Sequence, residues 1–160
     1  MCKGEIMEQA IKMLREQMIL CKRLVELFDA LRNELKNNSS GAGVTAAVQA
    51  IEPVMLKLSK QDKQIQEFLK STQFANLQEF VAAQSESVEK NVAERLLSQN
   101  INLQKELNNK LEDSSRMLLN SKAFIDFTMN VMSRTTASDI YGPPGTAMRN
   151  NSQSIFRANI

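Results

Sequence analysis

Residues 86–133 read ESVEKNVAERLLSQNINLQKELNNKLEDSSRMLLNSKAFIDFTMNVMS and contain neither glycine nor proline. Apolar side chains recur in this stretch at helical spacing, which predicts a long amphipathic helix. They are Val88, Val92, Leu96, Leu103, Leu107, Leu111, Leu118, Ile125, Met129 and Met132. Such a helix would extend on the order of 70 Å, whereas a compact chain of this length has a radius of gyration of only about 15 Å. We therefore expect an elongated molecule with one very long C-terminal helix.

Two further helices are predicted upstream. Residues 5–37 carry one continuous apolar stripe and end in the turn-forming run NNSSGAG, which predicts a loop between antiparallel helices. A second helix is expected over roughly 44–71, and Pro53 should end its first turns or kink it, because proline cannot donate the interior hydrogen bond. A short apolar cluster within 72–86 predicts a brief helix at a corner. The fold class is therefore all-α, an elongated antiparallel helical bundle or hairpin.

The helical pattern stops near residue 134. The polar break is followed by Tyr141-Gly142-Pro143-Pro144-Gly145, which holds two of the three prolines, and then by a polar segment to Ile160. Such composition is typical of a segment that does not pack into a core. We expect a helical bundle domain over 1–133 and a flexible C-terminal tail over 134–160.

Composition and charge restrict the class of partner. The formal net charge is +2, and basic and acidic residues alternate along the chain, so neither a nucleic acid nor an anionic membrane is expected as the main partner. The N-terminus carries Lys3, Glu5 and Glu8 and lacks the apolar core of a signal peptide. No window reaches the apolar length of a membrane span. We expect a cytoplasmic protein without membrane insertion.

The chain offers little material for catalysis. It has no histidine and only two cysteines, Cys2 and Cys21, which cannot complete the tetrahedral site that structural zinc prefers. No phosphate-binding glycine loop, paired carboxylates or dinucleotide motif is present. Asp126 lies between apolar neighbours, but a helix turns its side chain about 100° away from each of them. We expect no enzymatic activity, no cofactor and no metal site, and Cys21 should be a buried, reduced thiol.

The apolar residues near the end of the predicted long helix occupy more than one of its faces. They are Met117, Leu118, Leu119, Phe124, Ile125, Phe127, Met129, Val131 and Met132. One interpretation is a helix buried between two others. The other is that one stripe packs internally while a second awaits a partner helix, to which flexible Met side chains adapt well. The pattern alone leaves both open.

The tail presents a similar choice. Tyr141, the only tyrosine, follows Ile140 immediately before the glycines and prolines. It is either part of a turn that caps the bundle or an aromatic anchor on a flexible tether that inserts into a partner's pocket. Ile155, Phe156 and Ile160 form a second apolar cluster in this otherwise polar segment. Composition does not separate these interpretations.

Taken together, these parts resemble the FlgN family of flagellar type III export chaperones. The resemblance is carried by Leu118-Leu119, by Phe124-Ile125-x-Phe127, and above all by Ile140-Tyr141-Gly142 with Gly145 beyond the long helix. The chain departs from the family pattern at Ser114 and Ser115, where asparagines are frequent. It also departs at Pro143-Pro144, which stiffens the tail motif.

The resemblance implies a division of labour along the chain. The long helix, together with the first, is expected to bind the C-terminal helical segment of hook-filament junction (hook-associated) proteins and to prevent premature assembly. The implied client-binding residues are Leu111, Leu118, Phe124, Ile125, Met129 and Met132. Tyr141, Gly142 and Gly145 are expected to contact the cytoplasmic domain of the export gate. The alternative is a self-associating structural coiled coil without an export client, for example a homodimer.

Overall fold

The computed structural model describes residues 2–37 and 41–118 of the chain. Every element in these ranges is a helix: α1 spans Lys3–Lys36, α2 Gly41–Thr72, α3 Leu77–Ala82 and α4 Val88–Leu118. The all-α prediction is confirmed for this part of the chain. The predicted helix beyond Leu118 and the predicted tail lie outside the described residues. Within its described part, α4 has 31 residues, a length of about 46 Å at ~1.5 Å per residue.

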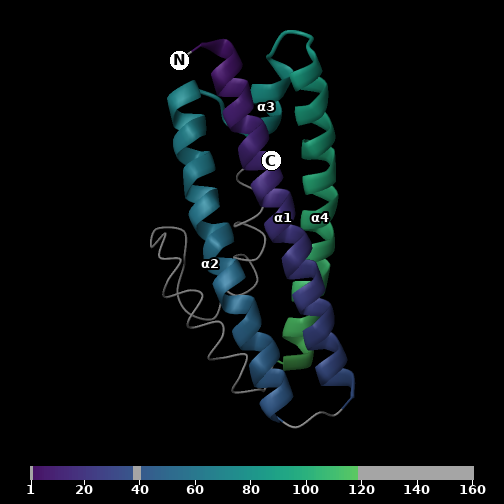
Figure 1. The fold of residues 1–160 in the computed structure, drawn as a ribbon. Coiled ribbons are helices and arrows are strands. Elements are labelled where there is room, and N and C mark those ends of the chain that lie inside the picture. Colours follow the sequence, from purple (N-terminus) through teal and green to yellow (C-terminus); the bar gives the residue numbers. More distant parts are fainter. Residues whose placement is uncertain (1, 38–40, 119–160) are drawn as a thin grey trace.

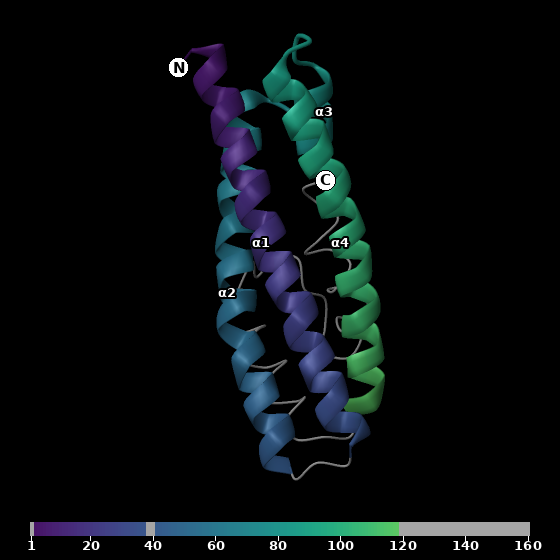
Figure 2. The same ribbon diagram turned by 45° about the vertical axis from the view of Figure 1, so that its right-hand side comes forward.

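Helix α1 lies between the two other long helices (Figure 1). It packs extensively against both α4 and α2, whereas α2 and α4 make few contacts with each other. The turned view in Figure 2 shows the same arrangement, with α3 at the end of the bundle where α2 leads into α4. Helices α1 and α4 run parallel, and α2 runs antiparallel to both. The predicted antiparallel hairpin is therefore α1 with α2, and a parallel neighbour completes the bundle.

Local hydrogen bonds account for several helix ends. At the start of α1, the Glu5 carboxylate accepts a hydrogen bond from the Cys2 main-chain N–H (3.0 Å). At the start of α3, the Asn76 side-chain oxygen accepts a hydrogen bond from the Glu79 main-chain N–H (2.8 Å). Each bond satisfies a main-chain donor that has no partner within the helix. At the end of α2, the Thr72 hydroxyl donates back to the Phe68 carbonyl (2.9 Å). Gln73 then takes a positive φ of 62°, which ends the helix in the left-handed region.

Helix α2 differs from its predicted form in two ways. It continues through Pro53, so the first of the two effects expected of the proline, an end of the first turns, does not occur. It also begins at Gly41, within the run assigned to the loop. Ile51, Met55 and Leu58 are buried on either side of the proline and hold this helix against α1, and such packing stabilises a helix more than intrinsic propensity does.

The buried apolar residues form two separate clusters. The proximal core lies at the α3 end of the bundle and comprises Met7, Ala10, Ile11, Met13, Leu14, Ile65, Phe68, Leu69, Leu77, Phe80, Val81, Ala93, Leu96 and Leu97. The distal core lies toward the start of α2 and comprises Cys21, Leu24, Leu27, Phe28, Leu31, Val48, Ile51, Met55, Leu58, Leu107 and Leu118. The predicted stripes are thus largely internal. Val88, expected on a stripe, is 75% exposed because it is the first residue of α4, at the end of the bundle.

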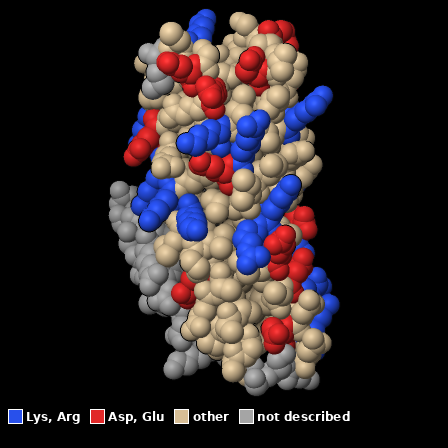
Figure 3. All heavy atoms as spheres, viewed as in Figure 1, with Lys and Arg blue, Asp and Glu red and all other residues tan. Residues whose placement is uncertain are grey.

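The surface carries mixed charges. Lys and Arg side chains lie among Asp and Glu side chains over the face shown in Figure 3. The beginning of α2 is different, because residues 41–51 include no charged side chain and the lower part of that face is mostly uncharged.

None of the helices in the described ranges combines the length and apolar character needed to cross a membrane.

Candidate functional site

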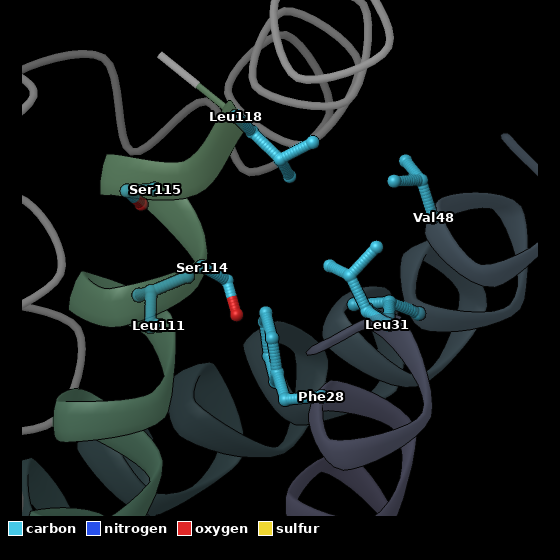
Figure 4. Close-up of a pocket in the computed structure, with 8 residues that line it drawn as sticks. Phe28, Leu31, Val48, Leu111, Ser114, Ser115 and Leu118 are labelled. Atoms are coloured by element: carbon cyan, nitrogen blue, oxygen red, sulfur yellow. The ribbon is translucent and has the colours of Figure 1, made fainter. Parts of the chain in front are cut away.

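A pocket lies in the distal half of the bundle, where the end of α4 approaches α1 and α2 (Figure 4). Its lining residues are Phe28 and Leu31 of α1, Val48 and Ile51 of α2, and Leu111, Ser114, Ser115 and Leu118 of α4. None of these side chains is charged. The lining is therefore apolar apart from two serine hydroxyls, and it includes no general base that could activate them as nucleophiles.

Helical spacing brings the α4 residues of the pocket together. Leu111, Ser114 and Leu118 follow one another at steps of three and four, so they lie on one face of α4. Ser114 is buried at 3% exposure and lies beside Phe28 in Figure 4. Because a serine side chain is much shorter than those of the two leucines, it leaves space between them. The hollow therefore arises at Ser114.

The pocket is narrow in this structure. Phe28, Leu31 and Leu118 are each only 2% exposed, and the space between them accommodates roughly one water molecule. Leu111 is half-buried at the edge, and Met117, on the neighbouring surface of α4, is 44% exposed. A guest side chain could enter only if the helices moved apart.

Ion pairs lie close to the pocket. The Lys110 ammonium of α4 contacts the Asp29 carboxylate of α1 and lies 3.8 Å from the Glu106 carboxylate. Lys110 is adjacent in sequence to the pocket residue Leu111, and Asp29 is adjacent to the pocket residue Phe28. Asp29 is half exposed, and ion pairs of this kind contribute only modestly to stability. The pair nevertheless joins α4 to α1 at this end of the bundle.

Burial raises the pKa of two side chains in the bundle. Cys21 is fully buried in the distal core, as expected from the sequence, and burial raises the pKa of its thiol to about 12. Burial also raises the pKa of the Asp62 carboxyl in α2 to about 7. Within the described ranges, no three Cys, Asp or Glu residues are grouped so that they could hold a metal ion.

Two of the residues expected to bind a client lie in this pocket, and the others lie outside the described residues. Leu111 and Leu118 line the pocket with Phe28 and Leu31 of α1. The expected client-binding residues Phe124, Ile125, Met129 and Met132 lie beyond Leu118, as do the expected gate-binding residues Tyr141, Gly142 and Gly145. Val48 and Ile51 were missed as pocket residues. They lie on the apolar stripe of α2, and the sequence pattern assigned that stripe to the core.

Comparison with known proteins identifies one family. A family model described as FlgN protein matches residues 2–149, which is nearly the whole chain and includes the tail motif at Tyr141. No curated protein and no solved structure matches the chain.

Proposed function

Because the chain belongs to the FlgN family of flagellar export chaperones, we propose that it binds the C-terminal helical segments of hook-filament junction (hook-associated) proteins in the cytoplasm. Binding would cover the apolar stripe of each segment and prevent assembly before export. Holding of this kind requires no nucleotide, since a chaperone that binds the segment lowers the concentration of the free, assembly-competent form by mass action.

The observation that carries the proposal is the apolar pocket at the end of α4. Leu111 and Leu118, two of the residues that the resemblance assigned to client binding, line it with Phe28 and Leu31. An amphipathic helix binds a groove through apolar side chains spaced three and four residues apart, and this pocket would receive one such side chain once the helices around it move apart. We propose that Phe124, Ile125, Met129 and Met132 extend the same surface along the chain.

The tail is proposed to deliver the loaded chaperone. Tyr141, Gly142 and Gly145 fall within the part of the chain that the family model matches. In this proposal Tyr141 is an aromatic anchor that contacts the cytoplasmic domain of the export gate, and the two glycines allow the main chain to approach closely. Client binding and gate binding would then use different parts of the molecule.

Filling the pocket tests the client site. Ser115 is half-buried on the pocket lining, and Ser115→Phe would place a ring where the guest side chain is expected. We expect this substitution to weaken binding of a hook-associated C-terminal segment at least tenfold in a calorimetric titration, with helical circular dichroism unchanged. The matched control is Ile19→Phe, because Ile19 is 62% exposed on α1 and does not line the pocket.

The two outcomes that contradict the proposal are distinct. If the Ser115→Phe and Ile19→Phe variants bound the hook-associated segment with equal affinity, the pocket would not be part of the client site. If no hook-associated segment binds the unmodified chain and sedimentation shows concentration-dependent self-association, the self-associating coiled coil would replace the chaperone.

A further inference from the structure

Four buried amide side chains separate the proximal core from the distal core. Gln17 of α1 is 3% exposed, Gln61 of α2 is 4% exposed, and Asn100 and Gln104 of α4 are 0% and 5% exposed. Each occupies a core-facing position between the two apolar clusters: Gln17 lies between Leu14 and Cys21, Gln61 between Leu58 and Ile65, and the α4 pair between Leu97 and Leu107. We call these four residues the amide layer.

Two residues of the amide layer bind α1 from different helices. The Gln61 side-chain amide donates to the main-chain carbonyl of Met13 (2.7 Å), and that of Asn100 donates to the carbonyl of Leu14 (2.9 Å). The two acceptors are consecutive residues of α1. Helices α2 and α4 are therefore both joined to α1 at one level of the bundle.

The amide layer is only partly hydrogen-bonded. The side-chain oxygens of Gln17, Gln61 and Asn100 and the side-chain nitrogen of Gln104 are buried without a hydrogen-bond partner among the described residues. Buried polar atoms without partners oppose burial, because they regain hydrogen bonds when water enters. Opening of the bundle at this level hydrates all four of these atoms together. Opening within either apolar cluster exposes mainly apolar surface, although the distal half also holds two single unpartnered atoms, Arg32 Nε and Asn108 Oδ1.

The proximal half is held together by more elements than the distal half. Helix α3 contacts both α2 and α4, and Phe80 of α3 packs edge-to-face on Phe68 and Phe74, with ring centroids 5.1 and 5.5 Å apart. In the distal half no described element joins α2 to α4. There α4 is held to α1 by apolar contacts beside the narrow pocket and by the Lys110–Asp29 ion pair.

We propose that the amide layer divides the bundle into two units that open separately, and that opening of the distal unit is the step that admits a client helix. The admission step depends on the function proposed above, but the division itself does not. Proteins open locally in cooperative units that follow contiguous packing, and here the packing is interrupted at one level on all three long helices. The pocket in the distal unit is too narrow to accept a side chain until this unit opens.

Hydrogen exchange of the full chain without client tests the division. The informative comparison uses segments of one helix on opposite sides of the layer: residues 21–31 against 7–14 in α1, and 105–114 against 90–97 in α4. We expect main-chain amides of the distal segments to exchange at least tenfold faster than those of the proximal segments. Equal exchange rates in the unmodified chain would overturn the two-unit division.

Replacing the amide layer tests its role. The combined variant Gln17→Leu, Gln61→Leu, Asn100→Leu and Gln104→Leu makes the core continuous with side chains of similar size. We expect its distal and proximal exchange rates to agree within about threefold. The control is Gln9→Leu with Gln99→Leu, which replaces exposed amides on α1 and α4 and should keep the tenfold difference. A difference that survives in the four-leucine variant would overturn the role of the layer.

Experiments with a client segment test the admission step separately from the division of the bundle into two units. With a hook-associated C-terminal segment at saturation, we expect the distal segments to become at least tenfold more protected while the proximal segments remain unchanged. Association should also be at least tenfold slower with the four-leucine variant than with the surface control. Equal association rates would overturn the admission step. Absence of any binding would overturn the proposed function and the admission step, whereas the division would still stand on the client-free exchange rates.

Discussion

The Asn100 side chain of α4 is fully buried and donates a hydrogen bond from its amide nitrogen to the main-chain carbonyl of Leu14 in α1, at 2.9 Å. The two residues belong to parallel helices that are far apart in the sequence, and this bond joins them at the level of the amide layer. The other side-chain atom, the Asn100 oxygen, has no hydrogen-bond partner among the described residues. The same residue therefore contributes one satisfied and one unsatisfied buried group.

Substitutions at Asn100 should separate these two contributions. Asn100→Leu removes the hydrogen bond and the unsatisfied oxygen together, so the free energy of unfolding should change by less than about 1 kcal/mol. Asn100→Asp places a carboxylate in the same buried position and should destabilise the fold at pH 7 by about 3 kcal/mol. Urea denaturation followed by circular dichroism measures both values. Equal losses for the two variants would contradict this account of the site.

The two cysteines should differ in reactivity. Cys2 is exposed, whereas Cys21 is fully buried and has its pKa raised to about 12 by burial. Thiolate is the reactive form, so a disulfide reagent such as DTNB at pH 8 should modify one thiol per chain rapidly and the second only slowly or after urea is added. Cys2→Ser should abolish the rapid phase. Rapid modification of two thiols in the folded chain would contradict the burial of Cys21.

Asp62 should make stability depend on pH. Burial raises its pKa from 3.8 to about 7, so the folded state binds this proton more tightly than the unfolded state does. The contribution is favourable at low pH and is lost as pH rises from about 4 to about 7, where the partly buried carboxyl must ionise.

Asp62→Asn should therefore be more stable than the unmodified chain at pH 8, by about 1–2 kcal/mol after allowance for partial exposure, and this advantage should vanish near pH 4. Urea denaturation at a series of pH values measures the difference. Asp113→Asn, at an exposed position of α4, is the control. An advantage for Asp62→Asn that is the same at every pH would contradict the assignment to ionisation.

Tyr141→Ala should separate client binding from delivery. If the tail contacts the export gate and the pocket binds the client, this substitution should leave client affinity within about twofold of the unmodified value, since removal of an anchor weakens only its own interface. Secretion of the client should fall strongly. Calorimetric titration and a secretion assay with equal amounts of chaperone measure the two effects, with Tyr141→Phe as the conservative variant. Equal loss of binding and secretion would contradict the tether.

Most of the helical architecture could be predicted from the sequence. Apolar side chains at steps of three and four predict helices at α1, α2 and α4, and the cluster around Leu77 and Phe80 predicts the short α3. The continuity of α2 was predicted less well, because packing around Pro53 maintains the helix despite the missing donor. The position of Cys21 on an apolar stripe correctly indicated burial.

The candidate site could be predicted only in part. Leu111 and Leu118 were named from the resemblance, but Val48 and Ile51 share the pocket only because α2 and α4 both pack against α1. A short loop indicates that the two helices it connects pack side by side. It does not indicate whether helices that are not consecutive in the sequence, such as α1 and α4, pack together. A helical stripe likewise shows that a side chain faces inward, but it does not identify the residues that it contacts.

Periodicity in the chain therefore specifies which residues form helices and which face of each helix is apolar, because helical spacing is a local property. The tertiary structure alone brings Gln17, Gln61, Asn100 and Gln104 to one level and places a narrow pocket beside Ser114. Both features depend on the axial alignment of three helices against one another. That alignment is determined by packing and by hydrogen bonds between residues distant in the sequence, such as Gln61 with Met13 and Asn100 with Leu14.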